Sequence, residues 1–414
     1  MKTLLCSSLF LSVGVCLAAP PVAKDSPEDK KAHQLISQLG SKKYREREKA
    51  AADLIQMGRS AKEALISGKN HPDPEVQTRT QQLLPQALSL DLMHRIERFV
   101  KDTDGKLEHD LPMLKVYREK IGTDENSRKL FAEMLKANGE LMDMVEEQPA
   151  KVTERIQQKF QEMYQEMFGN QFGGFRGGYQ PGAFNANELC CVLFVSASPA
   201  YKPLQPDWML SNLYTQPNFT NHLKDEKTGS AYRKVFFTYL DARMDDNTIN
   251  QCVWMLTQHK IKEGADIIAK AIKNGKASQV YTKANAMCCV GTLGDKSHLP
   301  AFEPLLKDDK QVQAFNNRGQ SGEIKVKDVA LAMTIHLSGK NPKDFGFTMW
   351  NVYPNQLIQY HQLGFGSPDE RAKAFKKWEE EGKKPAVKKE VPKKEVPKVD
   401  PPKVDPPKLD PKKN

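Results

Sequence analysis

Apolar residues recur at helical spacing through the N-terminal part of the chain. Between Asp29 and Leu88, four short stretches place apolar side chains at the i, i+3, i+4 and i+7 positions that line one helix face. The intervals contain Gly40, Gly58 and Gly68, and Gly40 is expected to adopt the left-handed conformation that ends a helix. Helices this short are marginal in water by themselves, so each has to pack against a neighbour. The pattern therefore predicts an array of stacked helix pairs.

Start and stop signals place several of these helices. Asp73 is predicted to cap the fourth helix, with Pro74 at its first position, and Asp124 is predicted to cap a later one. Apolar positions continue the helical face as far as Asp102, where the sequence Asp-Thr-Asp-Gly predicts a turn. A calcium loop starting at Asp102 would need glutamate where Met113 stands, so the turn is the better interpretation.

A second series of helical patterns occupies the C-terminal half. The expected helices span residues 232–243, 248–259, 265–273, 278–293, 298–307 and 325–337. The starts at 248 and 278 are 30 residues apart, which is close to the repeat length of stacked helix pairs. Asp308–Glu323 is expected to be a loop insertion. Insertions in solenoids tend to fall on one face, so this loop marks the predicted binding face.

The stretch between the two series mixes linker and helix signals. Residues 169–182 contain six glycines and interleaved aromatic residues, which favours a flexible linker. An alternative is a segment that stacks on single-stranded nucleic acid. The apolar run Leu189–Phe194 is expected to be helical. Residues 199–230 are expected to be irregular, with exposed aromatic side chains at Tyr201, Trp208 and Tyr214.

Both ends of the chain differ from its body. Met1–Ala19 has one lysine, an apolar core and two small residues at its end, which is the pattern of a cleaved secretory signal peptide. No later run is long and apolar enough for a bilayer, so no integral membrane span is expected after signal cleavage. From Lys388 onward, pentads such as KVDPP follow one another, and a proline in every pentad predicts an extended, solvated tail.

The net charge of +10 is mostly a property of this tail. Residues 383–414 contain 11 lysines against 5 acidic residues, which leaves little excess charge for the folded body. A body this balanced gives no general argument for nucleic-acid binding. For the tail, a solvated spacer and a weak polyanion contact are both open, and the interleaved acidic residues favour the spacer.

Five cysteines remain after the predicted signal peptide. An odd number in an exported protein leaves at least one thiol without an intramolecular partner. Their spacing fits neither zinc ligands nor a CxxC redox motif, and the two adjacent pairs lie in apolar runs, so buried thiols are expected. The alternative is one disulfide from Cys252 to one of the others. The five residues are Cys190, Cys191, Cys252, Cys288 and Cys289.

Several sequence segments resemble those of HEAT-repeat proteins that bacteria export, a group abundant in planctomycetes. In the N-terminal part these are SKKYREREKAAADLIQMGRSAKEAL (41–65) and HPDPEVQTRTQQLL (71–84). In the C-terminal part they are GTLGDKSHLPAFEPLL (291–306), KVKDVALAMTIHLSGKNPKDFGF (325–347) and RAKAFKKW (371–378). The resemblance implies an α-solenoid, and it brings no agreed reaction, cofactor or catalytic residue.

The predicted fold class is all-α: an α-solenoid of HEAT-like helix pairs in two arrays, followed by a disordered Lys/Pro-rich tail. The expected segments are a signal peptide (1–19), a linker (20–28), an N-terminal array (29–100), a helical segment (101–168), a flexible linker (169–184), a C-terminal array (185–347), a terminal cap (348–381) and the tail (382–414). The helix of the cap is expected to start at Ser367 or Asp369.

The sequence contains no GxSxG elbow, HExxH helix or Walker loop. His298 and His336 are expected to have structural roles and not to bind a metal. The acidic pair Asp245 and Asp246 stands where a helix begins, so N-capping explains it without catalysis. No catalytic, cofactor-binding or metal-binding residue is therefore predicted.

Three functions compete at this point. The first is a non-catalytic scaffold, exported to the periplasm or cell exterior, that binds an unknown protein of the cell envelope. The second is a polyanion-binding or cell-wall-binding protein that acts through its tail. The third is an enzyme on a helical-repeat scaffold, either thiol-based through the cysteine pairs or of the lyase type. The missing catalytic motifs favour the first.

Overall fold

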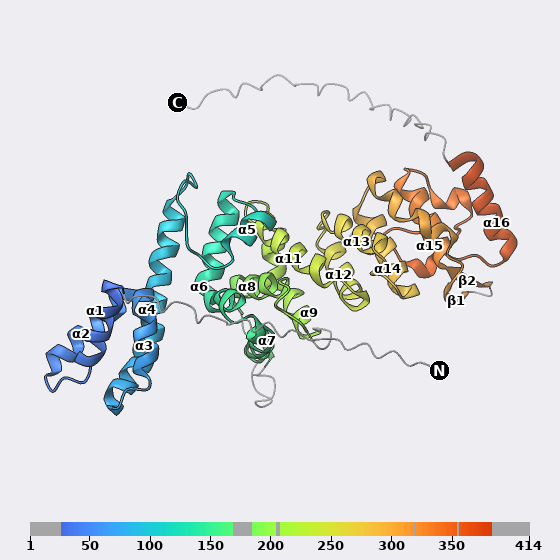
Figure 1. Cartoon of the computed structure of the whole chain (residues 1–414). Helices are drawn as coiled ribbons and strands as arrows, with labels where there is room; N and C mark the ends of the chain where they lie inside the picture. Colours follow the sequence, from blue (N-terminus) through green and yellow to red (C-terminus); the bar gives the residue numbers. More distant parts are fainter. Residues whose placement is uncertain (1–25, 169–183, 204–207, 318–319, 354–355, 383–414) are drawn as a thin grey trace, which may run out of the picture. The chain divides into compact units, whose positions relative to one another are not determined.

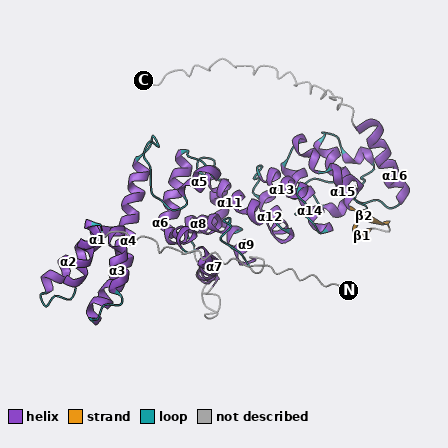
Figure 2. Ribbon diagram, in the orientation of Figure 1, coloured by secondary structure: helices purple, strands orange, loops and turns teal. Residues whose placement is uncertain are grey.

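The protein is mostly helical and divides into two compact units. The computed structural model describes residues 26–168, 184–203, 208–317, 320–353 and 356–382. We call the part up to Arg243 unit 1 and the part from Met244 unit 2. Figures 1 and 2 show that helices form nearly all the regular structure of the described chain.

Unit 1 is built from helices. They are α1 (Pro27–Gln38), α2 (Tyr44–Met57), α3 (Lys62–Gly68), α4 (Pro74–Lys101), α5 (Leu114–Lys120), α6 (Glu125–Glu147), α7 (Val152–Phe168), α8 (Ala186–Ser196), α9 (Trp208–Tyr214), α10 (Pro217–Lys224) and α11 (Gly229–Arg243), with the short 3-10 helices η1 (Gly58–Ala61) and η2 (Pro149–Lys151). The apolar stripes of α1 to α4 meet in one core that includes Ala32, Leu54, Leu65 and Val76. The helical stripes predicted for this region are confirmed, except that Tyr44, the first apolar position of the second stretch, is 65% exposed.

The predicted N-caps of two helices are confirmed. The Asp73 carboxylate accepts a hydrogen bond from the Glu75 N–H at 2.9 Å, and Asp124 accepts one from the Ser127 N–H at 3.0 Å. Each carboxylate therefore satisfies one of the free N–H groups of a first helical turn. The predicted turn at Asp102 is also present, because its carboxylate accepts hydrogen bonds from the Lys106 and Leu107 N–H groups.

The glycines of the first array act differently from the prediction. Gly40 is not left-handed, and Gly68 is the last residue of α3. A Cβ atom at Gly68 would lie 2.6 Å from the Thr80 side chain, so this glycine lets α3 approach α4 closely. Gly58 alone of the three has a positive φ, at +57°. The left-handed stop predicted at Gly40 is therefore wrong, and close packing is the reason for glycine at position 68.

Gly58→Ala is expected to destabilise unit 1 more than Gly105→Ala. Both glycines have a positive φ, which alanine adopts only at a cost of about 1–2 kcal/mol. At Gly58 the added Cβ would also lie 2.7 Å from the Asp91 Cβ, whereas at Gly105 nothing lies within 4 Å. Urea unfolding of the two variants measures the difference. Equal losses would show that helix α4 moves away from position 58 without penalty.

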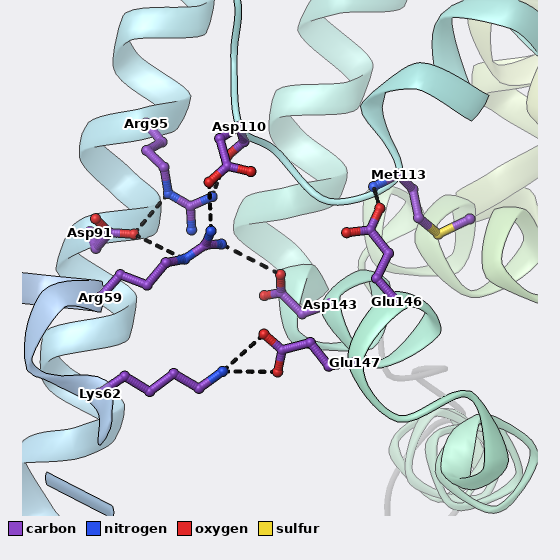
Figure 3. A network of polar contacts seen from close by, with 9 residues as sticks. All are labelled: Arg59, Lys62, Asp91, Arg95, Asp110, Met113, Asp143, Glu146 and Glu147. Atoms are coloured by element: carbon purple, nitrogen blue, oxygen red, sulfur yellow. Dashed lines mark hydrogen bonds and ion pairs between the residues drawn. The ribbon is translucent and has the colours of Figure 1, made fainter. Parts of the chain in front are cut away.

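A polar network joins η1 and α3 to α6 within unit 1 (Figure 3). Arg59 Nη1 lies 2.7 Å from Asp110 Oδ2, and Arg59 Nη2 lies 3.9 Å from Asp143 Oδ1. Lys62 Nζ lies 2.9 Å from Glu147 Oε1. These pairs are partly exposed, so each contributes little to stability. Each of these charged groups is paired with a group of opposite charge. The network therefore links the helices and offers a ligand no unpaired charge.

Residues 199–230 differ from the irregular stretch that we predicted. They contain α9 and α10, and Tyr201 and Tyr214 are buried, each with about 1% of its surface exposed. The Tyr214 ring packs 5.1 Å from the Phe236 ring of α11, centroid to centroid. The prolines of this stretch suggested loops, yet Pro217 occupies the first turn of α10, where a missing N–H is tolerated.

Unit 2 contains five α-helices among its described residues, together with a β-hairpin. The elements are α12 (Asp246–Gln258), α13 (Gly264–Lys273), α14 (Val280–Leu293), η4 (Lys296–Ala301), η5 (Glu303–Lys307), β1 (Gln311–Asn317), β2 (Gln320–Lys325), α15 (Val326–Leu337), η6 (Pro342–Phe345), η7 (Tyr360–Gln362), α16 (Pro368–Lys377) and the π-helical turn η8 (Trp378–Gly382). Predicted helices in this region are confirmed, except that two 3-10 helices replace the one expected over 298–307.

The predicted loop Asp308–Glu323 is mostly a β-hairpin, so the all-α class is correct only as a mainly helical fold. β1 and β2 pair antiparallel, and β2 is bridged on its other side at Glu323 by Phe365. A Cβ atom at Gly322 would lie 2.3 Å from the Phe365 carbonyl oxygen, so glycine permits this contact. Ser367 caps α16 by accepting a hydrogen bond from the Glu370 N–H, which confirms one of the two predicted starts.

Several predicted segments lie outside the described residues. These are the signal peptide 1–19, the linker 20–28 in its larger part, the glycine-rich linker 169–184 except for Phe184, and the tail from Lys383 onward. The two compact units are also divided differently from the predicted arrays. α8 packs against α6 in unit 1, whereas the prediction grouped residues 185–243 with the C-terminal array.

Candidate functional site: the exposed face of α12 and α14

Helices α12 and α14 lie side by side in unit 2 with their N-terminal ends together. The Asp246 carboxylate, in the first turn of α12, accepts hydrogen bonds from Ser278 N–H at 2.8 Å and Gln279 N–H at 3.1 Å. Partial burial raises the pKa of Asp246, but the hydrogen bond from the Ser278 hydroxyl, together with those from the two N–H groups, outweighs it and lowers the pKa overall. Asp245 caps α12 itself through Thr248 N–H at 2.8 Å, as predicted.

A row of polar side chains crosses between the two helices. Asn250 Nδ2 donates to Thr282 Oγ1 at 2.8 Å, and Asn285 Nδ2 donates to Asn250 Oδ1 at 3.1 Å. An amide side chain has two N–H groups and a carbonyl oxygen, so each asparagine retains hydrogen-bonding capacity beyond this row. The row fixes both half-buried amides between the two helices, and their remaining hydrogen-bonding groups are the ones available to the backbone of another chain.

Two exposed aromatic side chains flank the amide row. Trp254 follows Asn250 by one turn on α12, and Tyr281 precedes Asn285 by one turn on α14. Each has 48% of its surface exposed. Tryptophan and tyrosine provide large contact areas with few rotatable bonds, which makes them common anchors of protein interfaces. We call Asn250, Trp254, Tyr281 and Asn285 the α12–α14 face, and the buried Thr282 hydroxyl holds the Asn250 amide from below.

The same stripe of α14 is already covered at its C-terminal end. Positions 281, 285, 288 and 292 lie on one side of the helix. At this end, Thr292 Oγ1 accepts a hydrogen bond from the Ile358 N–H at 3.2 Å, and Ile358 is buried. An irregular segment of the chain itself therefore lies on α14 with its backbone bonded to a side chain. Tyr281 and Asn285 lie on the same side of α14 nearer its N-terminal end, and there the Tyr281 side chain is exposed.

The cysteines give no activated thiol. All five, namely Cys190, Cys191, Cys252, Cys288 and Cys289, are free and buried, so the disulfide alternative is not found. Burial raises the pKa of every one of them, to about 12 for Cys289. A thiolate is the nucleophilic form, so these thiols are poorly suited to covalent catalysis at neutral pH.

The histidines and acidic groups do not form a metal centre in the described part of the chain. No group of three or more histidine, cysteine, aspartate or glutamate side chains there has the geometry to hold a metal ion. His298 has the structural role predicted for it, because its ring contacts Asp266 at 3.2 Å and Asp295 at 3.4 Å. His336 lies at the C-terminal end of α15, far along the chain from the α12–α14 face.

The face was missed from the sequence, although one signal was present. Ile249, Val253 and Leu256 recur at helical spacing in the sequence, and the structure buries all three. Trp254 does not lie on that stripe, so its position pointed to an exposed tryptophan. Only the structure shows that Asn250 meets Thr282, 32 residues further along the chain.

No helix in the described ranges is both long enough and apolar enough to cross a membrane. Comparisons with protein-family models, with curated proteins and with solved structures found no match to this chain.

Proposed function

We propose that this protein is a non-catalytic helical scaffold that binds an extended segment of a partner protein on its α12–α14 face. The observation that carries the proposal is that this face lies on the same side of α14 as Thr292, which is covered by the segment around Ile358. There the protein already holds an irregular segment of its own chain by a side-chain hydrogen bond to a backbone N–H. Tyr281 and Asn285 of α14, together with Asn250 and Trp254 of the neighbouring α12, offer the same kind of contact nearer the N-terminal end of α14.

The chemistry of the face defines the kind of segment that fits. Asparagine amides can pair with the N–H and carbonyl groups of an extended backbone, which every peptide supplies. Trp254 and Tyr281 then select apolar or planar side chains of the bound segment. None of the residues of this face is charged, so the contact depends weakly on salt, unlike the tail-mediated polyanion binding that remains the alternative.

We also propose that the scaffold belongs to the exported HEAT-repeat type and acts in the cell envelope. The supporting observations are the apolar pattern of Met1–Ala19, the sequence phrases of the resemblance and the helical fold of both units. Fusion of residues 1–30 to a reporter that is active only after export tests this part separately. A reporter retained in the cytoplasm would contradict it without affecting the peptide-binding proposal.

Selection of peptides from a displayed random library on the full-length protein tests the binding proposal. Peptides that bind the α12–α14 face should bind the Trp254→Ala variant at least about tenfold more weakly, because truncation of a central tryptophan is a typical hot-spot loss. Tyr281→Ala should weaken binding to a smaller extent. Isothermal titration calorimetry measures both. Tyr44→Ala is the matched control, because Tyr44 is an exposed aromatic residue on α2 in unit 1.

Three outcomes would contradict the proposal. The library yields no binding peptide, Tyr44→Ala weakens binding as much as Trp254→Ala does, or neither substitution on the α12–α14 face has an effect. Analytical ultracentrifugation of the wild-type protein and of Trp254→Ala tests whether the face binds a second copy of the chain instead. If the wild type forms a dimer that the substitution dissociates, the occupant of the face is a second copy of the chain.

A further inference from the structure

An open hollow of about 510 Å³ lies in unit 2, away from the residues of the α12–α14 face. It is formed by the C-terminal end of α15, the turn that follows it, the start of η6 and the segment Trp350–Val352. Gly339, with φ +80°, makes the turn that brings α15 and η6 around the hollow. The polar side chains that face the hollow are those of His336, Lys340, Asn341, Lys343 and Asn351.

The charged residues that line the hollow are all cationic. Lys340 and Lys343 are both on its wall, and no aspartate or glutamate is among the lining residues. Lys340 Nζ donates to the Glu381 backbone carbonyl oxygen at 3.2 Å, and among the described residues no carboxylate forms an ion pair with it. Two like charges at one concave surface attract an anion from solution.

Asn341 adds hydrogen-bond donors to this surface. Its Oδ1 atom is occupied as the cap of η6, where it accepts the Lys343 N–H at 3.1 Å. The polar atoms that remain on the side chain are its two N–H groups, and these are donors. The hollow therefore combines ammonium and amide donors, which are the groups that bind carboxylate and phosphate oxygens.

His336 packs against Trp350 at the base of this region, with ring centroids 5.1 Å apart. Among the described residues no hydrogen bond reaches its imidazole nitrogens, in contrast to His298, which has two carboxylate neighbours. Burial lowers the pKa of His336, so the ring is neutral at neutral pH and can donate one N–H. The charged groups that face the hollow with it are Lys340 and Lys343.

We infer that this hollow is a binding site for a small oxyanion, with the ligand's carboxylate or phosphate oxygens held by Lys340, Lys343 and the Asn341 amide beside His336. The site is independent of the α12–α14 face. Residues 383–414 contain 11 lysines against 5 acidic residues, a composition that makes them a poor occupant of a cationic hollow.

Titration of the full-length protein with inorganic phosphate and, separately, with D-glucuronate tests the site. Nuclear magnetic resonance of the histidine rings is the readout, since a bound anion favours the charged imidazole and should raise the pKa of His336. The His298 ring resonances should not shift. Saturation by phosphate alone identifies a phosphate ligand, saturation by glucuronate alone a carboxylated one, and saturation by both a general oxyanion site.

Variants separate a built site from general attraction between charges. Lys343→Gln should weaken anion binding about tenfold, as expected for loss of a charge-assisted hydrogen bond, and the Lys340→Gln, Lys343→Gln double variant should abolish saturation. Lys276→Gln is the control, because Lys276 is an exposed lysine of unit 2 outside the hollow. The inference is overturned if neither anion gives a saturable shift of His336, or if Lys276→Gln weakens binding as much as Lys343→Gln.

Discussion

Arg371→Met is expected to destabilise unit 2 by about 3–5 kcal/mol, because it leaves a buried carboxylate without its partner. Arg371 Nε lies 2.8 Å from Asp328 Oδ1, and Asp328 has no exposed surface. The same guanidinium donates from Nη1 to Glu323 Oε1 and from Nη2 to the Glu323 carbonyl oxygen, both at 3.2 Å. One side chain thus joins α16, α15 and the hairpin. Urea unfolding measures the loss.

The destabilisation by Arg371→Met should be smaller in acid. Burial raises the pKa of Asp328, and the hydrogen bond from Arg371 opposes this rise. Without Arg371, the folded-state pKa moves further above the unfolded value of about 3.9. Between those two values the folded protein binds more protons than the unfolded one, so the free energy of unfolding falls as pH rises through this window. The variant should therefore lose less stability at about pH 4.5 than at about pH 7.5.

A double variant provides the control for this prediction. Asp328→Leu combined with Arg371→Met removes both charges and should recover much of the loss, since a buried ion pair replaced by apolar side chains is often near neutral in stability. Asp328 also accepts the Lys325 N–H at 2.8 Å as part of the α15 cap, so recovery should be incomplete. A single variant as stable as the double one, with no dependence on pH, would show that solvent reaches Asp328 once Arg371 is gone.

Local signals were sufficient to predict the helices and several of their caps. Asp73, Asp124, Asp245 and Ser367 all cap the helices that follow them, because an N-cap needs only its own side chain and the next few N–H groups. The apolar stripes likewise predicted which faces are buried, since the helical period is a property of the local sequence. These features depend on residues that are neighbours in the chain.

Features that depend on distant contacts were not predicted. The hairpin 311–325 is held by Phe365 and Arg371, which are 40 or more residues away from its first strand, and the sequence of the hairpin alone resembled a loop. α9 and α10 are too short to be stable without the aromatic cluster around Tyr214 and Phe236. The α12–α14 face has the same origin, because the Asn250–Thr282 contact becomes visible only when two helices are placed together.

Tyr117→Ala is expected to cost unit 1 about 3–5 kcal/mol, the usual loss for truncation of a buried aromatic ring. Tyr117 of α5 has 1% of its surface exposed, and its ring centroid lies 4.6 Å from that of Phe131 and 5.3 Å from that of Phe194. These rings come from α6 and α8, so removal of one opens a cavity where three helices meet. The hydroxyl also donates to the Ser127 carbonyl oxygen at 2.8 Å.

Two variants divide this loss into its parts. Tyr117→Phe keeps the ring and removes only the hydroxyl, so it should cost about 0.5–1.5 kcal/mol, the net contribution of one hydrogen bond, because the Ser127 carbonyl still accepts an N–H within α6. Val116→Ala is the neighbouring control, because Val116 is 43% exposed and its truncation should change stability by no more than about 0.5 kcal/mol. Hydrogen exchange followed by mass spectrometry resolves both units in the intact chain. In Tyr117→Ala, faster exchange should be confined to unit 1. If α13 to α15 lose as much protection as unit 1 does, the two units unfold together.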